Sequence, residues 1–347
     1  MRELVRVPFA GIVLGFVGGV SVAQVDPAAA PAAEPPSRAI PENYITAGPL
    51  HRVVAKPGDA LIGALQAAGA VAQEIDYGSF ELLLVEAAPL GGVGGLRATG
   101  AEIRDEWALI ELNGFLLDTA DPAALAAILA TVPPALTQSE EVAGVLPSLR
   151  IVQFAGPIRD EWLDALRATG ARPVIYVPHH AYVVSVEPGS LSRLAAFATE
   201  RFVQWTGPYH PAFRIRPDLR PTALEPVSFS NVVIQVIEDR HAVPFLELLA
   251  TQAVEPVGPA DSAAGFLNLP VSVPDWTISL LAGHPSVFAI EPKDFPERFD
   301  ERQGVISAGQ LNAGGTGPAS PSYFAWLASK GFQSSGQFAF VVDVHDD

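Results

Sequence analysis

The sequence of 347 residues contains no cysteine. Disulfides therefore cannot stabilise the chain, a lipid-modified cysteine cannot anchor it, and its stability has to come from buried area. Basic residues are also scarce, because 21 Lys and Arg stand against 38 Asp and Glu, giving a net charge of −17. Such an acidic surface repels phosphate backbones, so we expect no nucleic-acid partner.

Long apolar runs are equally rare, and the one that could reach across a bilayer lies at the start. Arg2 and Arg6 precede an uncharged stretch that begins at Val7 and ends in small residues. This pattern is typical of a secretory signal peptide over residues 1–23, cleaved after Ala23. The alternative is an uncleaved anchor, for which about 17 uncharged residues are at the short limit. We expect export, to a secreted or periplasmic location, and no membrane partner after signal cleavage.

The middle of the chain repeats one plan. Residues 24–48 are rich in Pro and Ala and predict an extended linker. After them, strand and helix patterns recur in the order β-α-β-β-α-β, the split unit of ferredoxin-like folds. This order is clearest in residues 146–222 and 226–300, and residues 49–145 form a looser copy. The sequence therefore predicts an α+β protein of tandem ferredoxin-like modules.

Local signals place several elements within these modules. Asn113-Gly114 predicts a two-residue hairpin, and His179-His180 predicts a solvated turn between two strands. The last strands of the two later modules, Val203–Pro208 and Val287–Pro292, end alike. Pro157 is expected to begin a helix.

Candidate sites in the modules are weak. The seven His residues lack metal-ligand spacing, and His284 is expected at a helix end, beside the negative end of the dipole. The glycine-rich residues 91–95 lack the Lys-Ser/Thr of a phosphate loop and predict a flexible link. The motif Ile-Arg-Asp-Glu-Trp occurs twice, in a predicted helix at 158–162 and in a predicted strand at 103–107. Aromatic residues 205–215 are expected to cover a module junction. We therefore expect no metal and no cofactor in this chain.

Residues 301–347 predict a different domain. A Gly-rich loop and a short helical pattern lead to an almost continuously apolar strand, which Asp346 and Asp347 follow. Such strands belong to parallel sheets, where the chemistry lies beyond the carboxyl ends of the strands. This closing segment resembles the opening of a subtilisin-like serine peptidase domain of the S8 family, which starts on a strand with the catalytic Asp at its end. The resemblance places that Asp at Asp346, whereas Asp343 is expected to be structural. The alternative is that Asp346 is an ordinary acid of a turn.

The family resemblance implies a truncated α/β domain after the modules. The His-Gly-Thr and Gly-Thr-Ser motifs of the family are absent, so the chain lacks the catalytic His and Ser and is expected to be inactive by itself. It would be the pro-region of a longer secreted endopeptidase, whose partners are its own missing catalytic domain and protein substrates. Calcium is possible in that missing domain. The alternative is a non-catalytic extracellular binding or scaffold protein built of repeated modules.

Overall fold

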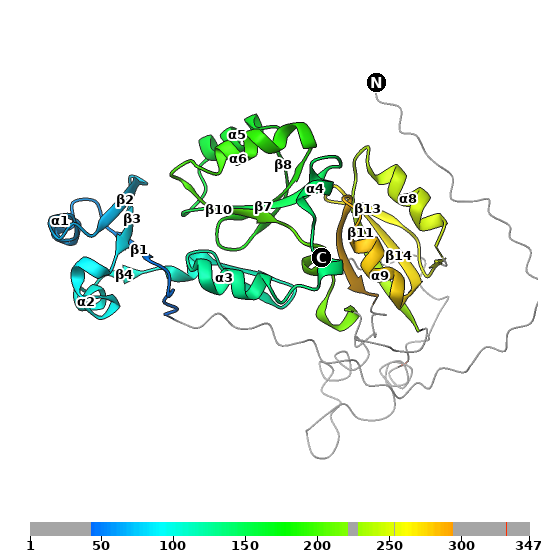
Figure 1. Cartoon of the computed structure of the whole chain (residues 1–347), viewed down its shortest axis with the longest axis horizontal. Coiled ribbons are helices and arrows are strands. Elements are labelled where there is room, and N and C mark those ends of the chain that lie inside the picture. The colour runs from blue at the N-terminus through cyan, green and yellow to red at the C-terminus, as the bar shows by residue number, and fades with distance from the viewer. Residues whose placement is uncertain (1–42, 221–227, 253, 294–330, 332–347) are drawn as a thin grey trace, which may run out of the picture. The chain divides into compact units, whose positions relative to one another are not determined.

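A computed structural model describes residues 43–220, 228–252, 254–293 and 331 (Figure 1). They belong to the larger of the two compact units of the chain, Ile40–Asp347. The predicted α+β class is confirmed, because the described elements form small antiparallel sheets with helices packed on them. The predicted opening of an α/β domain, Asp346 included, lies outside the described residues. None of the helices that the structure describes is long and apolar enough to cross a bilayer.

The first module has the β-α-β-β-α-β order that its sequence indicated only loosely. Its elements are, in chain order, β1 (Leu50–Ala55), α1 (Ala60–Ala67), β2 (Val71–Asp76), β3 (Glu81–Glu86), the 3-10 helix η1 (Ala88–Leu90), α2 (Val93–Ala98) and β4 (Glu102–Ile103). The Asp59 side chain accepts a hydrogen bond from the Leu61 amide and so caps α1. The flexible link predicted for residues 91–95 is wrong, since α2 begins at Val93 inside it.

An insertion follows the first module before the second one begins. It consists of η2 (Asp105–Ala108), β5 (Leu109–Leu112), β6 (Phe115–Asp118), α3 (Pro122–Leu129), η3 (Pro134–Leu136) and α4 (Glu140–Ala143). The predicted hairpin is confirmed, with Asn113 and Gly114 at positive φ angles of 43° and 82° between paired strands. The Ile-Arg-Asp-Glu-Trp motif at residues 103–107 lies mainly in η2, so its prediction as a strand was wrong. The two acids of the motif favour the start of a helical turn, where they face unpaired amides.

The second module repeats the order of the first. It contains β7 (Ser148–Phe154), α5 (Asp160–Ala168), β8 (Arg172–Val177), β9 (Ala181–Val186), η4 (Pro188–Ser190), α6 (Leu191–Phe197) and β10 (Val203–Pro208). Helix α5 begins at Asp160 rather than at Pro157, and two acids occupy its first turn. Two short elements, α7 (Pro211–Arg214) and η5 (Pro217–Leu219), then lead towards the third module.

The third module follows the same plan, except that its edge strand is divided into two short strands that both pair with β14. Its elements are β11 (Phe229–Ile237), α8 (Ala242–Ala250), β12 (Glu255–Pro256), β13 (Asp261–Ala263), β14 (Phe266–Pro274), α9 (Asp275–Ala282) and β15 (Val287–Pro292). The matching ends predicted for β10 and β15 are confirmed. All three sheets place the first and third main strands of the module at the centre, with orders β2-β3-β1-β4, β10-β7-β9-β8 and β12-β14-β11-β15.

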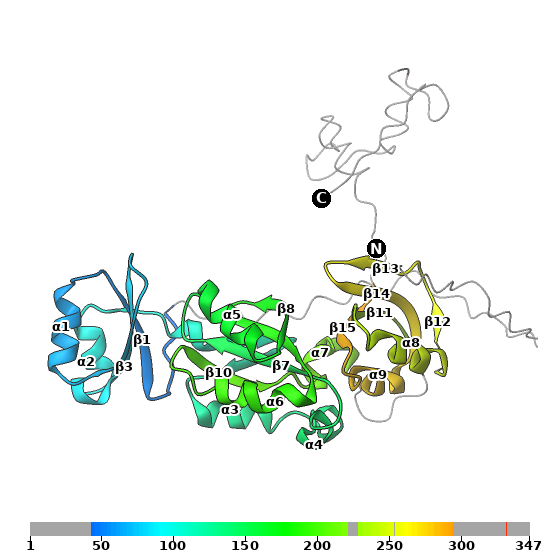
Figure 2. The ribbon, with the colours of Figure 1, turned by 90° about the horizontal axis from the view of Figure 1, so that it is seen from above.

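Each sheet packs its two helices on one face, but the opposite faces differ. In the second module, α5 and α6 lie on one side of the sheet and α3 on the other (Figures 1 and 2). The strand pleat explains this, because Val152 and Phe154 point to the helices while Leu149 and Ile151 point to the insertion. The insertion therefore shares its core with the second sheet. In the first module, Val54 and its neighbours on the face away from α1 and α2 pack with residues of the second module.

Candidate functional site

The predicted catalytic residue, Asp346, lies outside the described residues, as do Asp343 and the strand that carries both. Its assignment therefore stays a prediction. Three features of the described chain combine buried charge or free hydrogen-bonding groups, and each is built from residues distant in sequence. They are a carboxylate network around Asp105, a buried guanidinium at Arg214 and an accessible face on the third sheet.

The carboxylate network begins at Asp105, which is fully buried at the first residue of η2. One of its oxygens, Oδ2, lies 2.7 Å from Nδ1 of His51 and accepts the Thr46 amide at 3.2 Å. The other oxygen accepts the amide of Arg52 at 2.9 Å. A buried carboxylate is tolerated only when its lone pairs are used in this way. The network thus ties the start of β1 to the insertion.

A second carboxylate extends the network. Asp118, at the end of β6, accepts the hydroxyls of Tyr44 at 2.7 Å and Thr46 at 2.6 Å, and the amide of Ala120 at 2.9 Å. Burial, followed by the hydrogen bond to Asp118, raises the pKa of Tyr44 far above its ordinary value. The hydroxyl of Tyr44 therefore stays protonated and acts as a donor.

Arg52 lies on the opposite side of β1 from His51 and is also buried. Its Nε donates to the carbonyl of Ala155 in the second module at 3.4 Å, and burial lowers the pKa of Arg52 to about 10, opposed by Asp105. Its Nη2 atom has no hydrogen-bond partner within the described residues. The guanidinium thus reaches from the first sheet into the second module.

The His51–Asp105 pair has the geometry by which a carboxylate orients an imidazole in hydrolases. Its side chains are only 3% and 0% exposed, however, so a substrate could not reach the imidazole. We conclude that the pair is a structural clamp. Sequence analysis did not identify it, although two polar residues within the apolar strand Leu50–Ala55 were a usable signal.

The His179-His180 turn joins β8 to β9 as predicted, and both residues have φ near 64°. Their expected solvation is wrong. His179 Nδ1 lies 2.8 Å from the carbonyl of Leu109, and the His180 ring packs edge-on against Trp107 at 4.9 Å. Burial, followed by the nearby charges of His179 and Arg52, lowers the pKa of His180 to about 4. Both imidazoles therefore fix the second module to the insertion.

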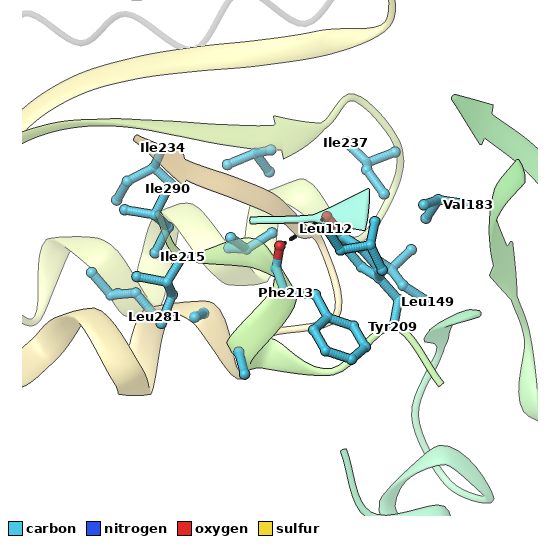
Figure 3. Packing of buried hydrophobic residues seen from close by; sticks show 14 of the residues in the cluster. Leu112, Leu149, Val183, Tyr209, Phe213, Ile215, Ile234, Ile237, Leu281 and Ile290 are labelled. Atoms are coloured by element: carbon cyan, nitrogen blue, oxygen red, sulfur yellow. Dashed lines mark hydrogen bonds between the residues drawn. The ribbon is translucent and has the colours of Figure 1, made fainter. Parts of the chain in front are cut away.

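The second feature is the contact between α7 and the third module, where the aromatic residues were predicted to cover a junction. This prediction is confirmed, because Tyr209 stacks on Phe288 with ring centroids 5.8 Å apart. Ile215 also forms a parallel β-bridge with Ile290, and Figure 3 shows both residues. Arg216 also donates its amide to the carbonyl of Ile290 at 3.2 Å. The segment after β10 thus adds to the edge of the third sheet.

Arg214 is buried at the centre of this contact. Its guanidinium donates to the carbonyls of Ala282 at 3.0 Å, His284 at 2.8 Å and Val287 at 3.2 Å. It also donates to the carbonyl of Tyr209 and to Oε1 of Gln138. Ala282 ends α9, so the cation satisfies carbonyls that a helix end leaves unpaired. Burial lowers the pKa of Arg214 to about 10.

Two histidines flank Arg214. His210 accepts the amide of Gln138 at its Nδ1 over 3.0 Å, and His284 accepts the amide of Ser286 at its Nδ1 over 3.2 Å. Burial, followed by the charge of Arg214, lowers the pKa of each to about 4. His284 is therefore neutral at pH 7, and it follows the C-terminal end of α9 as predicted.

The third feature is the side of the third sheet that faces away from α8 and α9. Alternate residues of β11 point to the helices, namely Val232, Ile234 and Val236. The residues between them, with their cross-strand neighbours, form what we term the free face of the third sheet: Asn231, Val233, Gln235, Asn268, Pro270, Ala289 and Glu291. Asn231 and Glu291 are exposed, whereas Pro270 and Ala289 are buried and the Oδ1 of Asn268 is buried without a hydrogen-bond partner within the described residues. The exposed positions of this face offer an amide and a carboxylate to a partner.

A comparison with known protein families gave one match. A family described as "Domain of unknown function (DUF8729)" matches residues 112–210. The match begins at Leu112, the last residue of β5, and extends to the end of the second module, so it joins most of the insertion to the sheet that it covers. A search of curated proteins found no match. Within the described ranges, no group of three or more His, Asp or Glu side chains could hold a metal ion.

Proposed function

We propose that this chain is the N-terminal pro-region of an exported subtilisin-like serine endopeptidase and that it assists and inhibits its own catalytic domain. The observation that supports the proposal most is the free face of the third sheet. It belongs to the module that directly precedes residues 301–347, and its exposed positions, Asn231 and Glu291, present hydrogen-bonding groups.

The composition of the free face suits this role. It combines accessible polar side chains such as Asn231 and Glu291 with the partly buried Val233. Interfaces that form and later separate are rich in polar groups, since both partners must be stable in water when apart. The strand β15, which carries Glu291 of this face, ends at Pro292.

In the parent enzyme, Asp346 would accept the Nδ1–H of a histidine encoded further along the chain. That contact would hold the imidazole in the tautomer that removes a proton from the serine nucleophile, and it would stabilise the imidazolium that forms. The modules take no part in this chemistry. Their contribution would be to cover the cleft until the connection between residues 293 and 346 is cut.

The test begins with the gene beyond codon 347, which should encode His-Gly-Thr and Gly-Thr-Ser segments. The complete precursor should mature by separation of the modules, whereas Asp346→Asn should leave it uncleaved, as followed by mass spectrometry. The present chain should inhibit the mature enzyme at micromolar concentration. Val233→Arg, on the free face, should weaken inhibition at least tenfold, and Val243→Arg, on the exposed side of α8, should not. A stop codon directly after codon 347 would overturn the proposal.

The second candidate is a non-catalytic binding or scaffold protein. The observation that favours it is the continuity of packing from module to module, with Arg52 and Arg214 both buried where segments of different modules meet. Such rigid arrays present extended surfaces to partners. Absence of any reading frame for a catalytic domain, with the chain stable and monomeric when purified, would decide in its favour.

A further inference from the structure

Helix α9 of the third module exposes two large apolar side chains. Trp276 is 61% exposed and Leu280 is 49% exposed. They lie four residues apart, so they are neighbours one turn apart on the same side of the helix. The buried residues of α9 lie on the opposite side, towards the core of the module: Thr277, Ile278, Leu281 and Ala282. Trp276 and Leu280 therefore form a ridge that points away from that core.

The helices that cover the other two sheets have no such ridge. Within the described residues of α1, α2, α5 and α6, no large apolar side chain is exposed. Helix α6, which has the place in the second module that α9 has in the third, exposes Ser192, Arg193 and Ala196. The fold therefore does not require apolar residues on this surface. Tryptophan is among the residues most enriched at the energetic centres of interfaces, so the ridge indicates a docking surface.

The ridge is also free of charge. Asp275 is the only charged residue of α9, and its carboxylate accepts the hydroxyl of Ser228. On the other helix of this layer, α8, Glu247 is the only charged residue. Because the chain has a net charge of −17, most of its surface repels a second copy. The ridge is a place where two copies can approach each other without opposing like charges.

The spacing along the ridge makes it complementary to itself. Gly283 is exposed and follows Trp276 by seven residues, which is about two turns, so it lies on the same side of α9. A Cβ built on Gly283 would meet only the backbone oxygens of Leu280 and Ser279, so the space above this glycine is open. In a two-fold contact, residue i of one copy faces residue j of the other, and j faces i. An axis near Leu280 places each Trp276 on the Gly283 of the other copy.

A lipid surface suits the ridge less well than a second copy. Helices that lie on membranes carry Lys or Arg beside their apolar side. Neither α8 nor α9 contains a Lys or an Arg. The acidic balance of the whole chain further disfavours anionic lipid.

From these observations we infer that Trp276, Leu280 and Gly283 form the contact surface of a homodimer, in which α9 packs antiparallel on α9 of a second copy across a two-fold axis. The inference does not depend on the pro-region role. The helices lie on the side of the third sheet opposite its free face, so the dimer leaves both free faces accessible. Two eight-residue helices bury less than the roughly 1,200–2,000 Å² of a stable interface, so the dimer is reversible. We expect a dissociation constant between about 10 µM and about 1 mM.

Sedimentation equilibrium of the purified chain over a range of concentrations tests for the dimer. The chain should be monomeric at about 1 µM and should form an increasing fraction of dimer up to about 500 µM. Trp276→Ala should raise the dissociation constant at least tenfold, because each dimer loses two large contact residues. The matched control is Val243→Glu, which changes an exposed apolar residue of α8 that is not on the ridge. This variant should associate as the parent does, and circular dichroism should show both variants to be folded.

A charge exchange at Leu280 tests the two-fold axis itself. In Leu280→Glu or in Leu280→Lys alone, like charges meet near the axis, so each variant should stay monomeric at about 500 µM. An equimolar mixture of the two should associate again, because opposite charges then face each other. The inference is overturned if the parent stays monomeric throughout, if Val243→Glu weakens association as much as Trp276→Ala, or if the mixture associates no better than either variant alone. Flotation of a monomeric parent with phosphatidylcholine vesicles, lost in Trp276→Ala, would also overturn it and assign the ridge to lipid.

Discussion

Replacing Asp105 by Asn tests whether the buried carboxylate network is the clamp that its geometry indicates. Asp105 receives hydrogen bonds from three donors, the ring of His51 and the amides of Thr46 and Arg52. An asparagine of the same shape has one acceptor oxygen and one NH₂ group. In either orientation at least one of the three donors then faces another donor.

The expected cost of Asp105→Asn combines two effects. Hydrogen bonds to a charged group contribute about 1.5–3 kcal/mol each, and a buried donor left unpaired loses about 1–3 kcal/mol. The variant also removes a negative charge that opposes the lowering of the Arg52 pKa by burial. Because these effects overlap, we expect a total loss of about 4 kcal/mol in the free energy of unfolding.

Urea unfolding of the full chain, followed by circular dichroism and tryptophan fluorescence, measures this loss. The control is Asp164→Asn, which removes a carboxylate from an exposed i,i+3 pair with Arg167. That variant should change the unfolding free energy by less than about 0.5 kcal/mol. An ordinary surface substitution changes the unfolding free energy by about 0.5 kcal/mol or less. If Asp105→Asn stays within that range, the network does not act as a clamp and our reasoning on it is wrong.

Three further predictions concern single sites. A Cβ at Gly48 would lie 1.9 Å from the carbonyl oxygen of Ala120, so Gly48→Ala should lower the unfolding free energy by about 2 kcal/mol. Gly63→Ala, in open space on α1, should instead raise it by roughly 0.5–1 kcal/mol in the same urea assay. His180→Phe should reduce the stability lost between pH 7.5 and 4.5 by about 2 kcal/mol, because the folded pKa of His180 is lowered to about 4 and acid favours unfolding. An unchanged pH dependence would contradict this assignment.

The repeated modules could be predicted from the sequence because their signals are local. The Asn113-Gly114 pair requires a hairpin, and the matching ends of β10 and β15 follow from strand patterns and turn residues. Each of these signals occupies fewer than ten residues. Antiparallel neighbours joined by short connections then give the sheet order with few alternatives.

The partner of each apolar face was not predictable in the same way. No sequence pattern in residues 105–143 predicts that β5, β6 and α3 cover the second sheet rather than the first. That choice depends on the shapes of two separate sheets and on which face of each sheet its own helices leave uncovered. For the same reason Asp105 did not stand out, since its donors Thr46, His51 and Arg52 lie more than 50 residues away along the chain.

The predictions for the glycine-rich residues 91–95 and for the His179-His180 turn were wrong for a different reason. Glycine frequency suggested flexibility at residues 91–95, but packing of Leu96 into the core of the first module holds α2 in place. His179 and His180 suggested a solvated turn, but the insertion lies against that turn. Tertiary contacts override local preference in both cases.

The three modules share a fold, and the difference between them lies in what covers the second face of each sheet. Residues of the second module pack on the first sheet, and the insertion packs on the second. The third sheet instead keeps Asn231 and Glu291 exposed at its free face. A repeat built only to extend an array would need a covering element there as well, or an apolar face for the next copy. These exposed polar residues on the sheet of the last described module suit a partner that binds and later dissociates. For that reason we favour the pro-region proposal over the scaffold proposal.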